Sequence, residues 1–447
     1  KGIKKLLPGH LLCLESPTIK NSPQSYWSLR EVTLDGMRRP FDGSDEEAVD
    51  ELEKLLKDTI MSRMVSDVPL GAFLSGGIDS STIVSLMQSQ SERPINTFTM
   101  GFHEHDFNEA VHAKKVAQHL GTNHTELYVS PQEAMDVIPK LSLMYDEPFA
   151  DSSQIPTHLI SDLAKKHVTV SLSGDGGDEL FGGYTRYFMA ERYWDLIRKI
   201  PYFLRQWSAK SIGSIPFKHV DNFINRIESF LPHKIKLSHP TEKLYKLGQI
   251  LSHSSLQSTY QRLVSVINEP DDFIIKGSPS ETLIDNLDIW HTFDENVTTM
   301  QYIDLMTYHP DDILVKVDRA AMAVSLETRL PYLDHEIVKF ATSLPLNKRF
   351  RNGQGKWLLR QVLYRYVPET LIERPKMGFG VPIGDWIKGP LRGWAEPLIN
   401  QERLTREGYF NTQTVSDMWM QHISGGYNRT HELWNILMFQ SWLESNK

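Results

Sequence analysis

Four short apolar runs that alternate with helical stretches constrain the fold of this chain more than any other feature. The runs cover residues 68–75, 95–102, 124–130 and 167–173. The stretches with helical spacing cover residues 79–90, 108–120, 131–145 and 153–166. Strands that alternate with helices in this way are typical of βαβ units, in which helices cover both faces of a parallel sheet. We therefore predict an α/β core built on a parallel sheet.

Composition limits the classes of protein to which such a core can belong. The 447 residues suffice for two or more domains, and 40% of them are hydrophobic, so the chain can bury sizeable cores. The net charge of -8 argues against a large nucleic-acid surface. Neither a signal peptide nor an apolar stretch of the ~20 residues that span a bilayer is visible. We expect a cytoplasmic protein with small-molecule substrates that binds neither nucleic acid nor a membrane.

The single cysteine, Cys13, excludes an internal disulfide and a thiolate metal cluster, which fits a reducing compartment. It lies in the apolar run HLLCL, so we predict a small buried hydrophobe rather than a nucleophile. The chain begins with Lys1 rather than Met, in the middle of a pattern. We therefore expect a fragment or a processed product.

Changes of pattern along the chain predict its domain organisation. Residues 1–34 are interpreted as short strands that end a β domain, and residues 35–45 as a linker rich in Gly, Asp and Pro. The rest of the chain, 46–447, opens with a helix whose capping box is formed by Ser44 and Glu47. The parts that we predict within it are the α/β core at 46–183, a variable helical region at 184–298 and a helical C-terminal part at 299–447 that completes the site.

The stretch FLSGGIDSS, residues 73–81, ends the first predicted strand and opens a helix. In an open α/β sheet, ligands bind at this end of the strands. Gly76 and Gly77 allow backbone N–H groups to turn toward an anion, and the helix N-terminus adds partial positive charge. Asp79 would repel a phosphate unless a cation such as Mg²⁺ lies between them. We therefore predict a site for a Mg²⁺-bound phosphate chain, with a plain strand–turn–helix as the alternative.

A second glycine-rich turn, SLSGDGGDELFGGY at residues 171–184, follows the fourth predicted strand. It carries three carboxylates within five residues, Asp175, Asp178 and Glu179. Two such turns at the carboxyl ends of strands can converge on one Mg²⁺–pyrophosphate group. Alone, this turn is equally compatible with a solvated acidic loop.

Two later segments carry positive charges that complement these acids. KVDRAAM, residues 316–322, places Lys316 and Arg319 on a helix, and RPKMGFG, residues 374–380, places Lys376 in a loop flanked by Gly and Pro. A lysine in such a loop can neutralise charge that develops on a transferred phosphate. Taken singly, each of these residues is more simply interpreted as a surface charge.

Together, these segments resemble one protein family. SGGIDSS is similar to the PP-loop of enzymes that cleave ATP between the α and β phosphates. The ordered set SGGIDSS, SGDGGDELFGGY, KVDRAAMAVSLETRLPYLD and RPKMGFG resembles the synthetase domain of glutamine-hydrolysing asparagine synthetases, over about residues 46–440. GIKKLLPGHLL followed by YWSL resembles the end of the family's N-terminal glutaminase domain, most of which we expect to be missing from this sequence. The resemblance implies a PP-loop α/β fold, a parallel sheet flanked by helices, with a largely helical C-terminal part.

The resemblance also implies a reaction in two steps, with ATP and Mg²⁺ as cofactors and a homodimer as a possible assembly. The side-chain carboxylate of aspartate attacks the α-phosphorus of ATP, which gives β-aspartyl-AMP and pyrophosphate. Ammonia, normally released from glutamine, then attacks the acyl-adenylate to give asparagine and AMP.

The site residues that the resemblance implies fall in the same segments. Those that would hold pyrophosphate are Ser75, Gly76, Gly77, Asp79 and Ser80, with Asp79 and Asp178 also holding Mg²⁺. Those that would line the adenosine are Leu74, Met100, Ser173 and Gly174. Asp175 falls where many members have a Glu that assists the attack of ammonia, and Lys376 would stabilise charge on the phosphates.

Two departures from the family pattern leave alternatives open. Asp175 is one methylene shorter than Glu, and the segment YDEPFADSSQIPTH, residues 145–158, differs from the Arg-containing segment associated with aspartate recognition. One alternative is therefore a related enzyme that amidates another carboxylate, such as a sugar uronic acid. Another is a nucleotide-binding module without catalysis. A third, a PP-loop protein that modifies tRNA, is disfavoured by the single cysteine and the acidic charge balance. Without a glutaminase half, we expect use of free ammonium rather than glutamine.

Overall fold

A parallel sheet of five strands organises the α/β fold, in the order β5-β4-β3-β6-β7. The strands are β3 (Leu70–Phe73), β4 (Asn96–Phe102), β5 (Asn123–Val129), β6 (Val170–Leu172) and β7 (Glu327–Arg329). Every neighbouring pair is parallel, and β3 lies between β4 and β6. The predicted α/β fold class is confirmed, and four of these strands lie within the runs or within one residue of the runs that the apolar pattern predicts.

The computed structural model describes most of the chain, and its description divides into two compact units. The described residues are 4–14, 22–102, 109–214, 248, 251–267, 270–275, 277, 281–374, 380–425 and 427–446. Unit 1 is drawn from residues 1–184, 301–382 and 441–447, and unit 2 from residues 185–300 and 383–440. None of the helices in this described part is long and apolar enough to cross a membrane.

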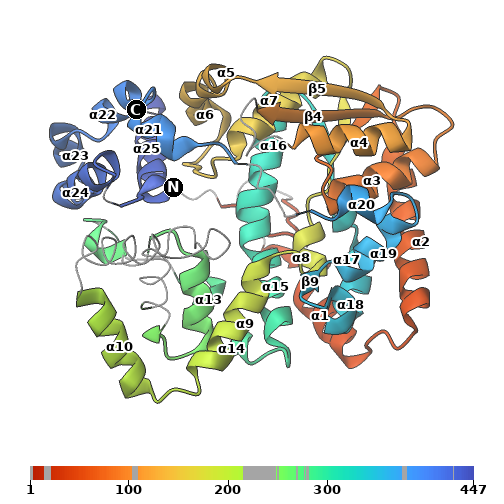
Figure 1. Ribbon diagram of the computed structural model, residues 1–447, viewed down its shortest axis with the longest axis horizontal. Helices are drawn as coiled ribbons and strands as arrows, with labels where there is room; N and C mark the ends of the chain where they lie inside the picture. The colour runs from red at the N-terminus through yellow and green to blue at the C-terminus, as the bar shows by residue number, and fades with distance from the viewer. Residues whose placement is uncertain are drawn as a thin grey trace, which may run out of the picture. The chain divides into compact units, whose positions relative to one another are not determined.

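The helices of unit 1 pack against the sheet and against one another. Those that follow the sheet strands are α3 (Ile78–Ser89), α4 (Ala110–Leu120), α5 (Pro131–Met135), α6 (Ile138–Met144), α7 (Gln154–Lys165) and α8 (Gly177–Phe181). Figure 1 shows α4 beside β4 and β5, which it contacts, and α7 contacts both β4 and α16 (Leu314–Met322). Helical packing on both sides of strands is what the βαβ pattern requires, because a parallel sheet is buried on its two faces.

Helix α2 (Asp45–Met64) illustrates how the sequence specifies an element. Ser44 and Glu47 form the predicted capping box, in which each side chain binds the other residue's backbone N–H. Leu52, Leu56 and Ile60 are fully buried at helical spacing, on the face that contacts α3 and α19 (Trp357–Tyr364).

The remaining elements of unit 1 surround this core. They are β1 (His10–Leu11), β2 (Gln24–Ser25), α1 (Leu29–Arg38), the π-helical turn η5 (His309–Ile313), η6 (Pro331–Leu333), α17 (His335–Ser343), α18 (Leu346–Arg349), β8 (Phe350–Arg351), β9 (Gln354–Gly355) and α20 (Glu369–Ile372).

Unit 2 is helical in the residues that the structure describes. Its elements are α9 (Thr185–Ile197), α10 (Tyr202–Ser214), α13 (Leu256–Val264), η3 (Pro270–Asp272), η4 (Leu283–Asp285), α14 (Leu287–Trp290), α21 (Ile383–Lys388), α22 (Arg392–Leu398), α23 (Gln401–Glu407) and α24 (Thr412–Ile423). Helices α15 (Asn296–Met306) and α25 (Thr430–Ser445) each contribute residues to both units.

Three expectations at the ends of the pattern are wrong. The second predicted strand before residue 34 is helix α1, which continues to Arg38 and so occupies the start of the predicted linker. Ser28 caps this helix by accepting the N–H of Glu31, a local signal that outweighs the aromatic and β-branched residues. Cys13 is exposed rather than buried, because the short β1–β2 pair covers little surface. Strand β7 falls in a part predicted to be helical, because its three residues are too few to show the two-residue period of a strand.

Candidate active site

The two glycine-rich turns lie next to each other because their strands are neighbours. Strands β3 and β6 pair in parallel, with Ala72 opposite Leu172, so both chains leave the sheet at the same edge. A Cβ atom on Gly174 would come within 2.8 Å of the backbone nitrogen of Ser80, so glycine is what allows the second turn to approach the first. The predicted convergence of the two turns is thus a property of the sheet topology.

Hydroxyl groups within the first turn accept hydrogen bonds from its backbone N–H groups. Gly76 adopts a φ of +72°, the left-handed region that glycine enters without a steric penalty. The backbone N–H of Ser75 donates to Ser80 Oγ at 3.1 Å, and the N–H of Gly77 donates to Ser75 Oγ at 3.2 Å. Helix α3 then begins at Ile78, so its N-terminal turn carries Asp79 and Ser80 beside the second turn.

The carboxylates of Asp79 and Asp178 converge on one ammonium group, that of Lys356. Lys356 Nζ lies 2.7 Å from Asp178 Oδ1 and forms a still shorter ion pair with Asp79 Oδ2. The lysine side chain is 6% exposed, whereas each carboxylate side chain is 20% exposed. Burial alone would lower the pKa of Lys356, but the two carboxylates raise it well above its ordinary value. Three charges from three separate segments therefore meet at the carboxyl edge of the sheet.

Sequence reasoning missed Lys356, although its backbone is unusual. It follows the β8–β9 pair and has a φ of +60°, which is rare for a residue with a side chain. Its backbone N–H donates to the Phe181 carbonyl at 2.9 Å, which fixes the residue at the C-terminal end of α8. Residues held in the left-handed region cluster at functional sites, because the surrounding structure must stabilise them. The Gly-Lys pair at 355–356 was the signal available in the sequence.

The pair formed by Asp79 and Asp178 fits the predicted Mg²⁺ in number and chemistry. Both carboxylates reach one point, and Mg²⁺ on a nucleotide needs only one or two carboxylates because phosphates and water supply its other ligands. Among the residues that the structure describes, no group of three or more His, Cys, Asp or Glu side chains is placed to hold a metal ion by itself. The site therefore suits a metal ion that arrives with a phosphate ligand.

The other residues of the second turn divide between the site and a buried network behind it. Asp175 Oδ2 accepts a hydrogen bond from Ser173 Oγ at 2.5 Å, which orients the predicted ammonia-transfer residue. Glu179 is 2% exposed; it accepts the hydroxyl of Tyr184 at 2.8 Å and lies 3.2 Å from His309 Nδ1. Burial alone would raise the pKa of Glu179, but His309 holds it below its ordinary value. Glu179 thus stabilises the fold under the turn that carries Asp178.

Of the residues predicted to line the adenosine, Met100 lies on β4, Leu74 directly follows β3, and Ser173 and Gly174 follow β6. The side chains of Leu74 and Met100 are buried, at 1% and 3% exposure, and the N–H of Leu74 donates to the Phe98 carbonyl of β4. Their part in nucleotide binding stays a prediction. Lys376 lies outside the described residues, and its predicted role on the phosphates is likewise untested.

The two charges of KVDRAAM have different environments. Arg319 is the surface charge predicted for it, with 46% exposure and an ion pair to Asp146 at 3.0 Å. For Lys316 that prediction is wrong: its side chain is 12% exposed, and Nζ lies 3.0 Å from Asp151 Oδ2. Helices α16 and α7 pack together, which carries Lys316 to the segment that contains Asp151.

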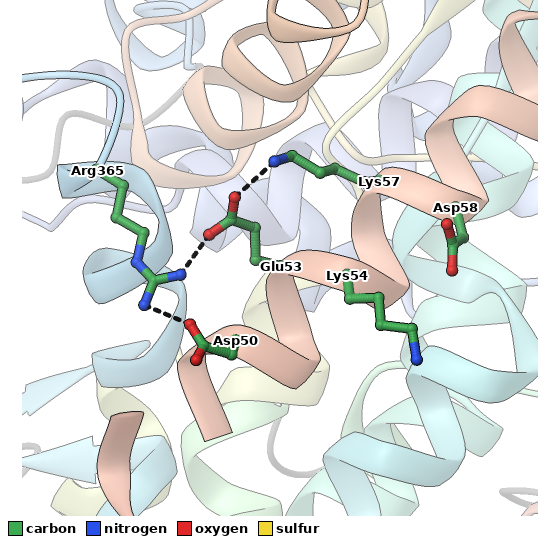
Figure 2. Close-up of a pocket in the computed structure, with 6 residues that line it drawn as sticks. All are labelled: Asp50, Glu53, Lys54, Lys57, Asp58 and Arg365. Atoms are coloured by element: carbon green, nitrogen blue, oxygen red, sulfur yellow. Dashed lines mark hydrogen bonds and ion pairs between the residues drawn. The ribbon is translucent and has the colours of Figure 1, made fainter. Parts of the chain in front are cut away.

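A separate cavity of about 300 Å³ lies away from these turns, between α2 and the residue that follows α19. Figure 2 shows Arg365 reaching both Glu53 and Asp50, while Lys57 reaches the other oxygen of Glu53. Burial alone would raise the pKa of Glu53, but Lys57, Tyr366 and Arg365 lower it to about 2. Because these charges neutralise one another, the cavity is an ion-pair network that ties α19 to α2 rather than a binding site.

Comparison with known proteins places this geometry in context. The family model described as asparagine synthase matches residues 51–444. A glutamine-hydrolyzing asparagine synthetase 1 of Bacillus subtilis is 32% identical over 422 residues, which cover 91% of this chain and 61% of that protein. A putative asparagine synthetase of Mycobacterium bovis is 33% identical over 89% of this chain and 58% of that protein. A more distant relative, the amidase chyE of Penicillium rubens, is 24% identical over 93% of this chain and 64% of that protein. The chain thus spans about 60% of the length of the first two relatives.

Proposed function

Because this chain belongs to the asparagine synthase family, we propose that it is an ATP-dependent ligase that forms an amide from a carboxylic acid and ammonia. The carboxylic acid is activated as an acyl-adenylate with release of pyrophosphate, and ammonia displaces AMP. The observation that carries this proposal is the convergence of Asp79, Asp178 and Lys356 where two glycine-rich turns meet. These residues lie at the carboxyl edge of the parallel sheet, where open α/β sheets bind their ligands, and this position supports a role in binding the phosphates of ATP.

In this proposal, Asp79 and Asp178 hold Mg²⁺, which when bound neutralises the charge of the phosphates. Lys356 adds a fixed positive charge at the same place and keeps two carboxylates together that would otherwise repel each other. Ser75, Gly77 and Ser80 present donors to the departing pyrophosphate. Lys376 stabilises charge on the phosphates during adenylation, so its change to Ala is expected to lower kcat rather than to raise the KM for ATP.

Aspartate is the first substrate to test, and asparagine the product. This rests on the names of the relatives at 32% and 33% identity. Their names also specify hydrolysis of glutamine; we propose that the residues of this chain use free ammonium. A second candidate, amidation of another carboxylate, is favoured by the distant relative named an amidase and by the departure of residues 145–158 from the family pattern.

A product assay tests the proposal. The purified chain is mixed with ATP, Mg²⁺, ammonium and aspartate, and AMP, pyrophosphate and asparagine are followed by mass spectrometry. Joint appearance of all three supports the ligase with aspartate as substrate. AMP and pyrophosphate without asparagine from aspartate would move the search to other carboxylic acids, such as uronic acids. Failure to cleave ATP with any carboxylic acid would favour a nucleotide-binding module.

Asp178→Asn and Asp162→Asn form a matched pair of variants for this assay. Both replace one carboxylate with an amide, but Asp162 is a half-exposed residue of α7 that pairs with Lys166, at 2.9 Å. We expect Asp178→Asn to reduce release of pyrophosphate by at least ~100-fold, and Asp162→Asn to leave it unchanged. Equal activity of the two variants would exclude Asp178 from the site.

A further inference from the structure

A second charged cluster is centred on Asp151. Asp151 Oδ2 forms an ion pair with Lys316 Nζ at 3.0 Å, and Oδ1 accepts the backbone N–H and the hydroxyl of Ser153 at 2.9 and 2.8 Å. Burial alone would raise the pKa of Asp151, but Lys316 and Ser153 hold it below its ordinary value. Asp151 is therefore an ionised carboxylate held in place by Lys316 and Ser153, with its side chain 21% exposed.

A second carboxylate, Asp312 of η5, interacts with Asp151 and with the ammonium group of Lys316. Its Oδ1 atom is buried and has no hydrogen-bond partner among the residues that the structure describes. Burial, the charge of Asp151 and a hydrogen bond between the two carboxyl groups raise the pKa of Asp312 to about 7, although the charge of Lys316 acts in the opposite direction. Two carboxylates thus share the single ammonium of Lys316, and the cluster lacks one positive charge when both are ionised.

A second observation comes from Tyr145, at the start of the segment that contains Asp151. The residue is 5% exposed, and its hydroxyl has no hydrogen-bond partner in the described part of the chain. Its ring stacks on Phe149 at a centroid distance of 4.6 Å, which fixes its direction. Burial, followed by the charges of Asp151 and Asp312, raises the pKa of this hydroxyl, so the hydroxyl lies within electrostatic reach of both carboxylates. A buried hydroxyl without a partner is costly, and a ligand that bonds to it removes that cost.

The charged groups around this cluster connect it to the proposed catalytic turn. Lys316 is influenced by Asp151 and Asp175, and to a smaller extent by Tyr308 just before η5; burial alone would lower its pKa, and these groups raise it. Asp175 is the residue predicted to assist the attack of ammonia. Lys316 therefore forms an ion pair with Asp151 and also lies within electrostatic range of Asp175.

We propose that Asp151, Asp312 and Tyr145 form a binding site for a substrate ammonium group, which supplies the missing positive charge. This inference rests on the proposed function and deepens it. The group is either the α-ammonium of an amino-acid acyl substrate or the ammonium ion that donates nitrogen. Both present N–H donors to carboxylate and hydroxyl oxygens, and charge-assisted hydrogen bonds of this kind are the strong ones. A sugar uronic acid without an amino group would leave the site unfilled.

Binding measurements test the site without relying on turnover. Isothermal titration calorimetry at about pH 8, where Asp312 is mostly ionised, compares L-aspartate, ammonium chloride and succinate, which lacks the amino group. Asp312→Asn removes the charge while keeping the shape, and we expect it to weaken one of the two ammonium-bearing probes by about 10- to 100-fold. If only the binding of L-aspartate is weakened, the site belongs to the acyl substrate. If only the binding of ammonium is weakened, it belongs to the nitrogen donor. Succinate is expected to bind both proteins equally.

Two further variants keep the test decisive. Asp311→Asn removes the neighbouring, exposed carboxylate of η5 and is expected to change neither affinity. Tyr145→Phe keeps the ring stacked on Phe149 and removes only the hydroxyl, so it probes the site if Asp312→Asn does not fold; we expect a loss of about 3- to 10-fold. The inference is overturned if the wild-type protein and these cluster variants bind both probes equally or not at all. A chain that binds L-aspartate through Asp312 but never releases pyrophosphate would instead refute the proposed function alone.

Discussion

Replacing Lys356 with Met tests whether one ammonium group holds the carboxylates of Asp79 and Asp178 together. Met preserves most of the buried side-chain volume and removes the charge. Asp79 and Asp178 both contact the same Nζ atom, so their oxygens are roughly 4–5 Å apart. Two negative charges at that separation repel each other by about 3–4 kcal/mol at an effective dielectric constant of about 20. Since each carboxylate is 20% exposed and can turn toward water, we expect unfolding free energy to fall by about 2–3 kcal/mol at pH 8.

The loss of unfolding free energy in Lys356→Met should depend on pH. Without Lys356, repulsion raises the folded-state pKa of one of the two carboxylates above its value in the unfolded chain. A carboxyl group with a raised folded pKa favours the folded state at low pH and loses that contribution as the pH rises through the raised value. The deficit of Lys356→Met is therefore greatest near pH 8 and shrinks toward about pH 4–5.

Urea unfolding read by hydrogen exchange in α3 and α19 measures the effect within unit 1, since a chain of two units need not unfold in one step. Lys348→Met is the control, because Lys348 is also buried but pairs with Asp45, whose side chain is 49% exposed. We expect the control to lose about 1 kcal/mol at most. The double variant with Asp178→Asn should recover most of the stability. Equal losses for Lys356→Met and Lys348→Met, at every pH, would refute the argument.

Three further outcomes follow from contacts described above. In a thermal unfolding assay, Mg²⁺ without nucleotide should stabilise Lys356→Met, because a cation that binds only the folded state raises its stability. It should not stabilise the double variant with Asp178→Asn. Glu53→Gln should lower the free energy of unfolding by about 1–2 kcal/mol at pH 7. Because the folded-state pKa of Glu53 is lowered to about 2, its carboxylate stabilises the wild-type protein above the unfolded-state pKa, and this stabilisation is lost as the pH falls from 4.5 to about 2. The variant should lack that loss, which a pH series of urea midpoints measures. Ser44→Ala removes one half of the α2 capping box and should cost about 1 kcal/mol in urea unfolding, whereas Ser44→Asp should restore it.

The sequence by itself determined the elements whose causes are local. Alternating apolar runs and helical stretches predicted four strands of the sheet, and the capping box at Ser44 and Glu47 predicted where α2 begins. The two glycine-rich turns were predicted at the carboxyl ends of β3 and β6, because glycines and acids after an apolar run have a direct structural meaning. The local signals failed at α1 and β7, where the element is too short or its residues favour another structure.

Only the tertiary structure decided which distant charges meet. Lys356 is far from both glycine-rich turns in the sequence, yet a left-handed backbone after β9 directs its ammonium between Asp79 and Asp178. Lys316 was indistinguishable from a surface charge until the packing of α16 on α7 buried it beside Asp151. A charge pattern along the chain contains no information about burial or about partners hundreds of residues away. Packing supplies both, and it is packing that turns isolated acids and lysines into a site.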